Sequence, residues 1–261
     1  MNKFYVIGEK SSKSLSPHIF NYWFKKYKIK ATYDFVEIQS NDFNKSIKKI
    51  LEDKKTKGIN ITIPFKKKII QHIDNLDKHA LKINAVNCVT NKYKKNGTNT
   101  DWVGYGNSLP KITNLKEKNV LILGYGGAAH AIHYYFYLKK VKNITIVNRS
   151  KKKIKFKNNI CFTKNISDIE KFLIEADIII NTTPINPISK KVAKLVKPRA
   201  IISDIVYRPK NTKFLNMFPK NKKLFGITML INQAIPSFNN WFGFNPSVDK
   251  KLLNILFSKI K

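Results

Sequence analysis

The sequence predicts an α/β protein in which mostly parallel sheets are covered by helices. Two observations lead to this fold class. Short β-branched runs alternate with amphipathic segments along residues 4–64, an alternation that is typical of βαβ units. A buried run at 119–123 then passes through a glycine-rich turn into a helical segment, as in a nucleotide-binding βαβ unit. A chain of 261 residues is expected to form one domain or two closely associated ones.

The N-terminal segment is expected to alternate three strands with two helices. The strands are predicted at 4–8, 31–38 and 58–64, and the helices at 16–27 and 40–51. Ser16 is a favourable N-cap for the first helix, and Pro17 suits its first turn. Aromatic side chains then recur every three or four residues, so they should share one buried face. They are Phe20, Trp23, Phe24 and Tyr27.

The rest of the chain contains one predicted hairpin, a connector and a second βαβ unit. Two extended runs surround Asn96-Gly97, a pair that accepts positive φ and therefore predicts a hairpin turn. The stretch 103–118 carries glycines and a proline, which is typical of a connector. Strands are then expected at 119–123, 143–150, 176–184 and 199–209, and helices at 230–242 and 248–260.

The net charge of +34 points first to nucleic acid or an anionic membrane. Only three of the 50 basic residues are arginine, whereas base and phosphate recognition favours the planar guanidinium. We therefore expect salt-sensitive binding to polyanions but no specific nucleic acid partner. No apolar run approaches the roughly 20 residues of a membrane helix, and the N-terminus lacks a signal region, so a cytoplasmic protein without a membrane partner is expected.

Cysteine and histidine give no metal signature. Cys88 and Cys161 lie far apart, each in an apolar run, and are expected to be buried free thiols. His130 and His133 lie three residues apart on a predicted helix. Without further ligands nearby they are expected to be surface residues, and no metal is expected.

The turn after residues 119–123 carries three glycines, Gly124, Gly126 and Gly127. Glycines at a strand-to-helix turn let backbone N–H groups and the helix dipole hold a pyrophosphate. Ala128 permits close packing after the turn, and a second strand ends about twenty residues on. In this context the motif predicts a Rossmann-type dinucleotide site, although a tight turn alone also requires glycine.

The second strand ends at Asn148-Arg149, where an NAD-specific enzyme usually presents an acid to the ribose 2′-hydroxyl. Arg149 can instead pair with a 2′-phosphate, and Lys153 can add a second positive charge. NADP is therefore the expected cofactor. The alternative is that Arg149 and the neighbouring lysines are solvated loop residues.

Eight stretches of the sequence resemble the shikimate dehydrogenase family. They are SLSPHIFN (14–21), NITIPFK (60–66), AVN (85–87), NTD (99–101), GYGGAAHA (124–131), NRS (148–150), DIVYRP (204–209) and MLINQA (229–234). They follow the family's order through nearly the whole chain. The resemblance implies reversible, NADP-dependent reduction of 3-dehydroshikimate to shikimate, a step of the chorismate pathway of aromatic amino acid biosynthesis.

The resemblance also implies two domains with a cleft between them. Residues 1–101, completed by C-terminal helices at 228–261, would form the α/β domain that binds the substrate. Residues 102–227 would form the Rossmann-like domain that binds NADPH. The family tends toward monomers or homodimers, and both states stay open here.

One of three consecutive lysines is the expected catalytic residue. In the family's pattern the lysine directly after the Pro-x pair is catalytic, which selects Lys66 over Lys67 and Lys68. A ketone oxygen gains negative charge as hydride arrives, and a protonated lysine can supply the proton. The resemblance gives Asp101 the roles of holding that ammonium and of accepting a hydrogen bond from a substrate hydroxyl. Taken alone, Lys66 fits a surface lysine at a helix start, and Asp101 fits an N-cap.

Further site residues follow from the same resemblance. Ser14, Ser16 and Tyr207 would bind the substrate carboxylate. The alternative for Ser16 is a role as a helix cap only. Asn60, Thr62, Asn87 and Gln233 would surround the ring hydroxyls. Asn181 and Thr182 would lie in the loop beside the nicotinamide, with Met229 near its ring.

Four departures from the family's pattern concern the cleft and the cofactor. Trp102 follows the aspartate where glycine is common, and it can narrow the cleft. Asn84 replaces a glycine but tolerates left-handed φ. Thr228 replaces a glycine that permits close approach to the nicotinamide. The segment after Arg149 is short and β-rich, so a truncated Rossmann domain with an exposed adenosine side is expected.

Other functions compete with this one. A quinate/shikimate dehydrogenase that uses NAD has the same fold, but Arg149 argues against it. A non-catalytic polyanion-binding module would account for the charge but not for the intact Lys66 and Asp101. A related folate-type dehydrogenase would leave the paired serines at 14 and 16 unexplained.

Overall fold

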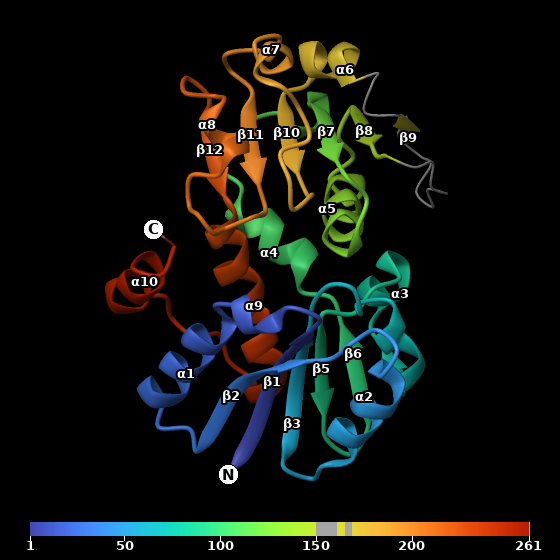
Figure 1. Ribbon diagram of the computed structural model, residues 1–261, viewed down its shortest axis with the longest axis vertical. Coiled ribbons are helices and arrows are strands. Elements are labelled where there is room, and N and C mark those ends of the chain that lie inside the picture. The colour runs from blue at the N-terminus through green and yellow to red at the C-terminus, as the bar shows by residue number, and fades with distance from the viewer. Residues whose placement is uncertain (150–160, 165–168, 261) are drawn as a thin grey trace. The chain divides into compact units, whose positions relative to one another are not determined.

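The computed structural model of the chain describes residues 1–149, 161–164 and 169–260, and for 161–164 it describes only the strand. These residues form two compact units (Figure 1). Unit 1 comprises Met1–Gly104 and Ile231–Lys259, and unit 2 comprises Tyr105–Leu230 together with Ile260. Each unit has its own sheet with helices packed on it, so the predicted α/β fold class is confirmed.

The sheet of unit 1 has six strands in the order β2-β1-β3-β5-β6-β4. They are β1 (Asn2–Gly8), β2 (Ala31–Glu37), β3 (Thr56–Ile61), β4 (Asn75–Leu76), β5 (Cys88–Asn91) and β6 (Lys95–Thr98). β1 pairs in parallel with β2 and β3, whereas β5 is antiparallel to β3 and β6. β4 pairs in parallel with β6. The three predicted N-terminal strands are therefore present, although β3 starts at Thr56 and ends at Ile61 where 58–64 was predicted. The pairing becomes mixed from β5 onward.

Alternation along β1 sends neighbouring side chains to opposite faces of the sheet. The ring of Phe4 lies 5.4 Å from that of Phe24 on α1 (Ser16–Lys26) and 4.8 Å from that of Trp241 on α9 (Gly226–Phe242). Ile7 instead packs in a cluster with Phe43 and Ile47 of α2 (Phe43–Glu52). α3 (Lys78–Ile83) adds Ala80 to the same cluster. Two aromatic and aliphatic layers thus enclose the sheet.

The remaining helices of unit 1 are short or peripheral. α10 (Lys250–Phe257) packs against α1. Two 3-10 turns are η1 (Ser11–Lys13) and η2 (Lys68–His72). The two helices predicted for the C-terminal tail correspond to α9 and α10, which confirms that prediction.

The predicted hairpin exists, but its turn was placed wrongly. Asn91 of β5 pairs with Lys95 of β6, so the turn comprises residues 92–94. Gly97 lies inside β6, where a Cβ would come 2.9 Å from the Ile73 side chain and 3.0 Å from that of Val86. The glycine at this position serves close packing, and positive φ is not what selects it.

Two further local predictions were wrong. Ser16 does not cap α1, since it is the first residue of that helix, and the hydroxyl of Ser14 accepts a hydrogen bond from its N–H at 3.2 Å. The predicted connector starts as a helix, α4 (Asp101–Ser108). The helix forms despite Gly104 and Gly106, because Gly104 lets it pack directly against α9.

The sheet of unit 2 has six parallel strands in the order β12-β11-β10-β7-β8-β9. They are β7 (Asn119–Leu123), β8 (Asn143–Val147), β9 (Cys161–Lys164), β10 (Ile178–Asn181), β11 (Ile201–Asp204) and β12 (Lys222–Phe225). This is the strand order of a doubly wound dinucleotide-binding sheet, whose ligands lie at the carboxyl ends of the strands. The order confirms the predicted Rossmann-type architecture.

Consecutive residues of β7 again separate two hydrophobic layers. Leu121 packs with Leu173 and Phe214, which come from α6 (Ile169–Glu175) and α8 (Lys213–Asn216). Ile122 packs with Ile132 and Phe136 of α5 (Gly127–Leu138). The other short helices are α7 (Lys190–Ala193) and η3 (Leu115–Glu117). Among the helices of the described ranges, none combines the length and the hydrophobicity that a transmembrane span requires.

Candidate active site

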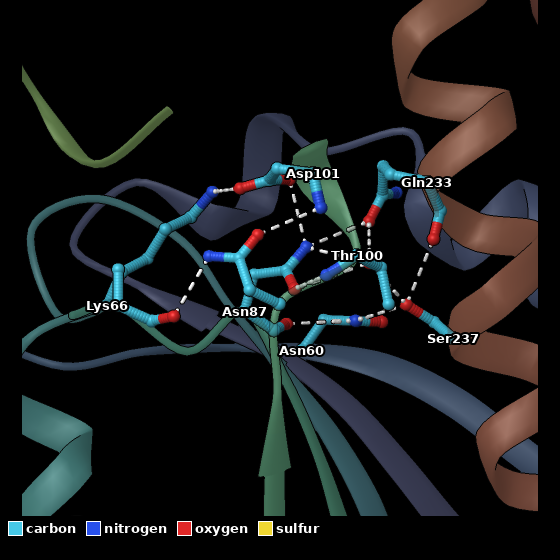
Figure 2. Close-up of polar contacts among 9 residues, drawn as sticks. Asn60, Lys66, Asn87, Thr100, Asp101, Gln233 and Ser237 are labelled. Carbon is cyan, nitrogen blue, oxygen red and sulfur yellow. Dashed lines mark hydrogen bonds and ion pairs between the residues drawn. The ribbon is translucent and has the colours of Figure 1, made fainter. Parts of the chain in front are cut away.

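Lys66 lies between β3 and η2 and differs sharply from the two lysines that follow it. Its Nζ is 2.5 Å from Oδ2 of Asp101 (Figure 2), and the two side chains are 12% and 6% exposed. Lys67 and Lys68 are exposed. Of the three consecutive lysines, Lys66 is therefore the one that is largely buried, and the fold holds it against the carboxylate of Asp101.

Asp101 is held from three directions at the start of α4. Its Oδ1 accepts a hydrogen bond from Nδ2 of Asn87 at 2.9 Å, while Lys66 occupies Oδ2. Its N–H donates to Oδ1 of Asn99 at 3.1 Å, and Asn99 in turn donates to the carbonyl of Ala85 at 2.9 Å. Side chains engage both carboxylate oxygens, so the alternative in which Asp101 serves only as an N-cap does not describe this site.

Asn87 connects Asp101 to a buried polar network (Figure 2). Its Oδ1 accepts a hydrogen bond from the N–H of Thr100 at 2.6 Å. Its Nδ2 also lies 3.3 Å from Oε1 of Gln233 on α9. The predicted substrate residues Asn87 and Gln233, 146 positions apart in sequence, are thus brought together beside the Lys66–Asp101 pair.

The network continues through Ser237 to the sheet. The hydroxyl of Ser237 lies 3.1 Å from that of Thr100 and accepts a hydrogen bond from Nδ2 of Asn60 at 3.2 Å. Oδ1 of Asn60 accepts from the hydroxyl of Tyr33 at 2.8 Å. All four of these hydrogen-bonded residues are buried. Satisfied networks of this kind fix side-chain positions, because an unpaired polar group in the interior is costly.

Sequence reasoning missed the residues that support this network. Thr100 and Asn99 lie in the NTD stretch, where the resemblance gives a role only to Asp101, and Ser237 lies outside all eight stretches. A Cβ at Gly104 would lie 2.6 Å from the backbone N of Gln233, so only glycine lets α4 and α9 approach this closely.

The two serines predicted at the substrate carboxylate are neighbours in space. The hydroxyl of Ser14 donates to that of Ser16 at 3.1 Å. Ser14 is half-buried and Ser16 is buried. Thr62, the remaining predicted substrate residue of unit 1, is half-buried directly after β3. Paired hydroxyls can both donate to a carboxylate.

Two of the departures noted in the sequence have a structural account within unit 1. Asn84 ends α3 with φ at 58°, the left-handed conformation that asparagine tolerates. The ring of Trp102 packs on that of His79 from α3, with centroids 4.5 Å apart and planes inclined by 33°. The indole next to Asp101 is thus held by an aromatic contact. Thr228 is half-buried at the start of α9.

The glycine turn of unit 2 has the geometry of a phosphate-binding turn. Gly124 has a φ of 91°, and its N–H donates to the carbonyl of Val147 at 2.8 Å. Gly126 is the N-cap of α5 and has no side chain with which to cap the first-turn N–H groups. Those groups, from Gly127 and Ala128 onward, can therefore bind an anion.

Side-chain hydrogen bonds of its own residues fix the conformation of the loop after β10. The buried Asn181 accepts a hydrogen bond from the N–H of Thr183 at 3.0 Å and donates to Oδ1 of Asp204 at 3.2 Å. The hydroxyl of Thr182 donates to the carbonyl of Leu123 at 2.7 Å. The side chains of Asn181 and Thr182 thus fix this loop and tie it to the ends of β11 and β7.

Asp204 at the end of β11 is a further residue that the sequence did not reveal. Its carboxylate accepts hydrogen bonds from the hydroxyl of Thr212 at 2.6 Å and from the N–H of Val206 at 3.0 Å. Burial raises the pKa of this carboxyl, and the three hydrogen bonds partly offset that rise. Asp204 ties together the loops that follow β10 and β11, next to the predicted Tyr207.

The other predicted cofactor residues lie at different depths. Met229 is buried in the hydrophobic cluster of unit 2 that also contains Ile122. Asn148 and Tyr207 are half-buried, and Arg149 is exposed after β8. Lys153 and the shortened segment that follows Arg149 lie outside the described residues.

The prediction of two surface histidines was wrong for His133. Its ring is completely buried, and its Nδ1 lies 3.0 Å from the hydroxyl of Tyr125. Burial lowers its pKa to about 4. His130 is half-buried. Helix α5 is apolar on nearly all sides, so a three-residue spacing on it does not identify a solvent face.

Cys88 is a buried free thiol, as predicted, and burial raises its pKa to about 11. The side chain of Cys161 lies outside the described residues. Among the residues whose side chains are described, no group of three or more His, Cys, Asp or Glu could hold a metal ion.

The buried His133 predicts a specific loss of stability in acid. Its folded pKa of about 4 lies below the 6.5 of an exposed histidine, so the unfolded chain binds a proton that the folded chain excludes between these pH values. The free energy of unfolding should therefore fall by about 3 kcal/mol on this account between pH 7 and pH 4. Urea denaturation across this range should show a shallower pH slope for His133→Gln than for the unaltered protein. Equal slopes would contradict the prediction.

Comparison with known proteins identifies relatives along the whole chain. Residues 6–89 match the family described as shikimate dehydrogenase substrate binding domain, and residues 108–211 match shikimate / quinate 5-dehydrogenase. A shikimate dehydrogenase (NADP(+)) from Staphylococcus epidermidis is 36% identical over 269 residues, which cover 99% of this chain and 98% of that protein.

Solved structures agree with these sequence relatives. Shikimate dehydrogenase from Aquifex aeolicus superposes with a TM-score of 0.86 at 32% identity, covering 98% of this chain and 97% of that one. A shikimate dehydrogenase in complex with NADP+ superposes with a TM-score of 0.88 at 28% identity, covering 100% of this chain and 96% of that one.

Proposed function

The chain belongs to the shikimate dehydrogenase family, and we propose that it uses Lys66 and Asp101 for the proton transfer of that family's reaction. It is an NADP-dependent oxidoreductase that interconverts 3-dehydroshikimate and shikimate. The observation that carries the assignment of roles is the contact of 2.5 Å between Lys66 and Asp101, both largely withdrawn from solvent.

The proton transfer follows from the chemistry of the ketone. When bound, NADPH supplies a hydride to the ring carbonyl carbon. The carbonyl oxygen then gains negative charge, which the Lys66 ammonium neutralises by donating a proton as the alcohol forms. In the reverse direction the neutral amine takes that proton back. Asp101 holds the ammonium through Oδ2 and, through Oδ1, is itself held by Asn87.

Substrate recognition is assigned to hydroxyl and amide groups of unit 1. Ser14 and Ser16 donate to the substrate carboxylate, and we add Tyr207 as a third donor. Amide side chains can both donate to and accept from ring hydroxyls, which suits Asn87 and Gln233 beside Asp101. The other residues assigned to the ring hydroxyls are Asn60 and Thr62. Buried polar groups left unpaired by an analogue lacking a hydroxyl would reject it.

The turn of unit 2 fits the pyrophosphate of NADP. No atom beyond the neighbouring residues lies within 4 Å of where a Cβ at Gly126 would stand, which leaves room for a phosphate against the backbone. The uncapped start of α5 supplies N–H donors and the helix dipole. We assign the 2′-phosphate to Asn148 and Arg149, with Lys153 as a second charge, and the nicotinamide side to the loop at 181–182 and to Met229.

Initial rates of shikimate oxidation, followed by the absorbance of the reduced cofactor, test this function. Shikimate with NADP should give the highest kcat/KM among the four combinations of shikimate or quinate with NADP or NAD. A faster reaction with quinate and NAD would instead support the rival quinate enzyme. Failure of the folded protein to turn over any combination would favour a non-catalytic polyanion-binding role.

Loss of Arg149 should weaken NADP binding selectively. Charge-assisted hydrogen bonds to a phosphate contribute about 1.5–3 kcal/mol, so Arg149→Ala should raise the KM for NADP by about tenfold or more. The KM for NAD, which lacks the phosphate, should stay within about twofold. Arg199→Ala removes the same charge at an exposed position before β11 and serves as the control. An equal rise for both cofactors would contradict the assignment.

We propose that residues 1–101 with the helices at 228–261 bind the substrate and that residues 102–227 bind the cofactor. The protein's partner is a small-molecule substrate, and it has no specific nucleic acid partner and no membrane partner. We place the protein in the cytoplasm. The protein acts as a monomer or a homodimer.

A further inference from the structure

Tyr125 is the one residue with a side chain in the turn at 124–127. That side chain is directed into unit 2, and Tyr125 is only 4% exposed. It belongs to the same hydrophobic cluster as Ala129 and Ile132. Its hydroxyl lies 3.0 Å from Nδ1 of His133, eight positions further on and about two turns along the chain of α5.

The ring of Tyr125 is fixed at its face as well as at its hydroxyl. His130 stacks on it with centroids 4.1 Å apart and planes inclined by 25°. The buried His133 is neutral at physiological pH, because burial lowers its pKa to about 4. A neutral imidazole has one nitrogen that accepts, and the tyrosine hydroxyl can donate to Nδ1 when the ring proton is on Nε2.

The glycines on either side of Tyr125 leave the conformation of the turn unrestrained unless a contact such as that of Tyr125 fixes it. Gly124 has a φ of 91°, and neither it nor Gly126 has a side chain that could hold the turn. Glycine is free to adopt many backbone conformations, so the N–H groups at the start of α5 would otherwise have to be ordered when an anion binds. Prior ordering of a binding loop raises affinity, because that entropy is lost before binding.

We infer that Tyr125 and His133 form a positioning pair that holds the glycine turn in the conformation that receives the pyrophosphate of NADP. This inference rests on the proposed cofactor site at that turn. Both residues belong to unit 2, which also carries the glycine turn, so the expected effect of the pair is on cofactor affinity.

Calorimetric titration of NADP into purified variants tests the pair. Tyr125→Phe keeps the ring and its stacking but removes the hydrogen bond, and it should raise the Kd for NADP by about tenfold. His133→Leu should raise the Kd similarly. The Kd of the double variant should not exceed the higher of the two single-variant Kd values, because both substitutions remove the same hydrogen bond. Amide hydrogen exchange across residues 122–130 should become faster in each variant, while the KM for shikimate stays unchanged.

Tyr134→Phe is the matched control, since it removes a hydroxyl from an equally buried tyrosine of α5. Its Kd should remain within about twofold of the unaltered protein's. Equal Kd values for Tyr125→Phe and Tyr134→Phe, or effects of Tyr125→Phe and His133→Leu that simply add, would overturn the positioning role. Absence of NADP binding by the unaltered protein would instead overturn the proposed cofactor site, and the pair with it.

Discussion

Replacing Lys66 by alanine should lower kcat for shikimate oxidation by about 10²- to 10⁴-fold, the range expected for the loss of a general acid–base group. The reason is geometric, because Lys66 is the lysine that the fold places 2.5 Å from Asp101. The Kd for NADP should not change. Steady-state kinetics and NADP titration of the same preparation measure both quantities.

The neighbouring lysine provides the control for this substitution. Lys67→Ala removes an identical charge one position along the chain, at an exposed side chain, and should leave kcat within about twofold. Lys66→Met keeps the partly buried stem, so it separates loss of the amine from loss of packing. If Lys67→Ala proved as damaging as Lys66→Ala, or if Lys66→Met retained full kcat, the catalytic assignment would be wrong.

Adding a methyl group at Gly126 should remove NADP binding without unfolding the protein. The Cβ of alanine would enter open space, so the free energy of unfolding should change by less than about 0.5 kcal/mol. In the bound state that methyl would stand where the backbone must approach the pyrophosphate. We expect the Kd for NADP to rise by about 100-fold, as for loss of about 3 kcal/mol of interaction.

The same substitution at Gly124 serves as the comparison and should act on folding. Its φ of 91° is unfavourable for alanine, and the new Cβ would lie 2.7 Å from Cγ2 of Thr183. Gly124→Ala should lower the free energy of unfolding by at least about 1–2 kcal/mol. Chemical denaturation and NADP titration of both variants distinguish the two roles. A destabilised Gly126→Ala, or one that binds NADP normally, would contradict the placement of the pyrophosphate.

The strands of this fold are predictable because burial on both faces imposes β-branched runs. β1, β3, β7 and β10 each contain at least two β-branched residues and lie close to where the sequence indicates. Helix α4 was missed because its own sequence contains two glycines, which disfavour a helix. Contact of Gly104 with α9 stabilises that helix, and local propensity carries no information about a partner more than a hundred residues away.

The active-site pair is predictable only in part. Spacing along the chain does not bring Lys66 to Asp101, which lies 35 positions away, so the motif resemblance was needed to connect them. The supporting Ser237 gave no local signal, because its partners Asn60 and Thr100 come from other elements. The surface exposure of His133 was predicted wrongly for a related reason. Its position on a helix is correct, but tertiary packing determines which face of that helix is buried.

Transfer of deuterium from labelled cofactor tests directly whether this protein reduces 3-dehydroshikimate with NADPH. The purified protein would be mixed with 3-dehydroshikimate and NADPH carrying deuterium at the transferred position of the nicotinamide, and the product examined by mass spectrometry and NMR. We expect shikimate with one deuterium on the carbon that bore the ketone, formed far more slowly by Lys66→Ala. Unlabelled product, or no product from a folded protein that binds NADPH, would contradict it.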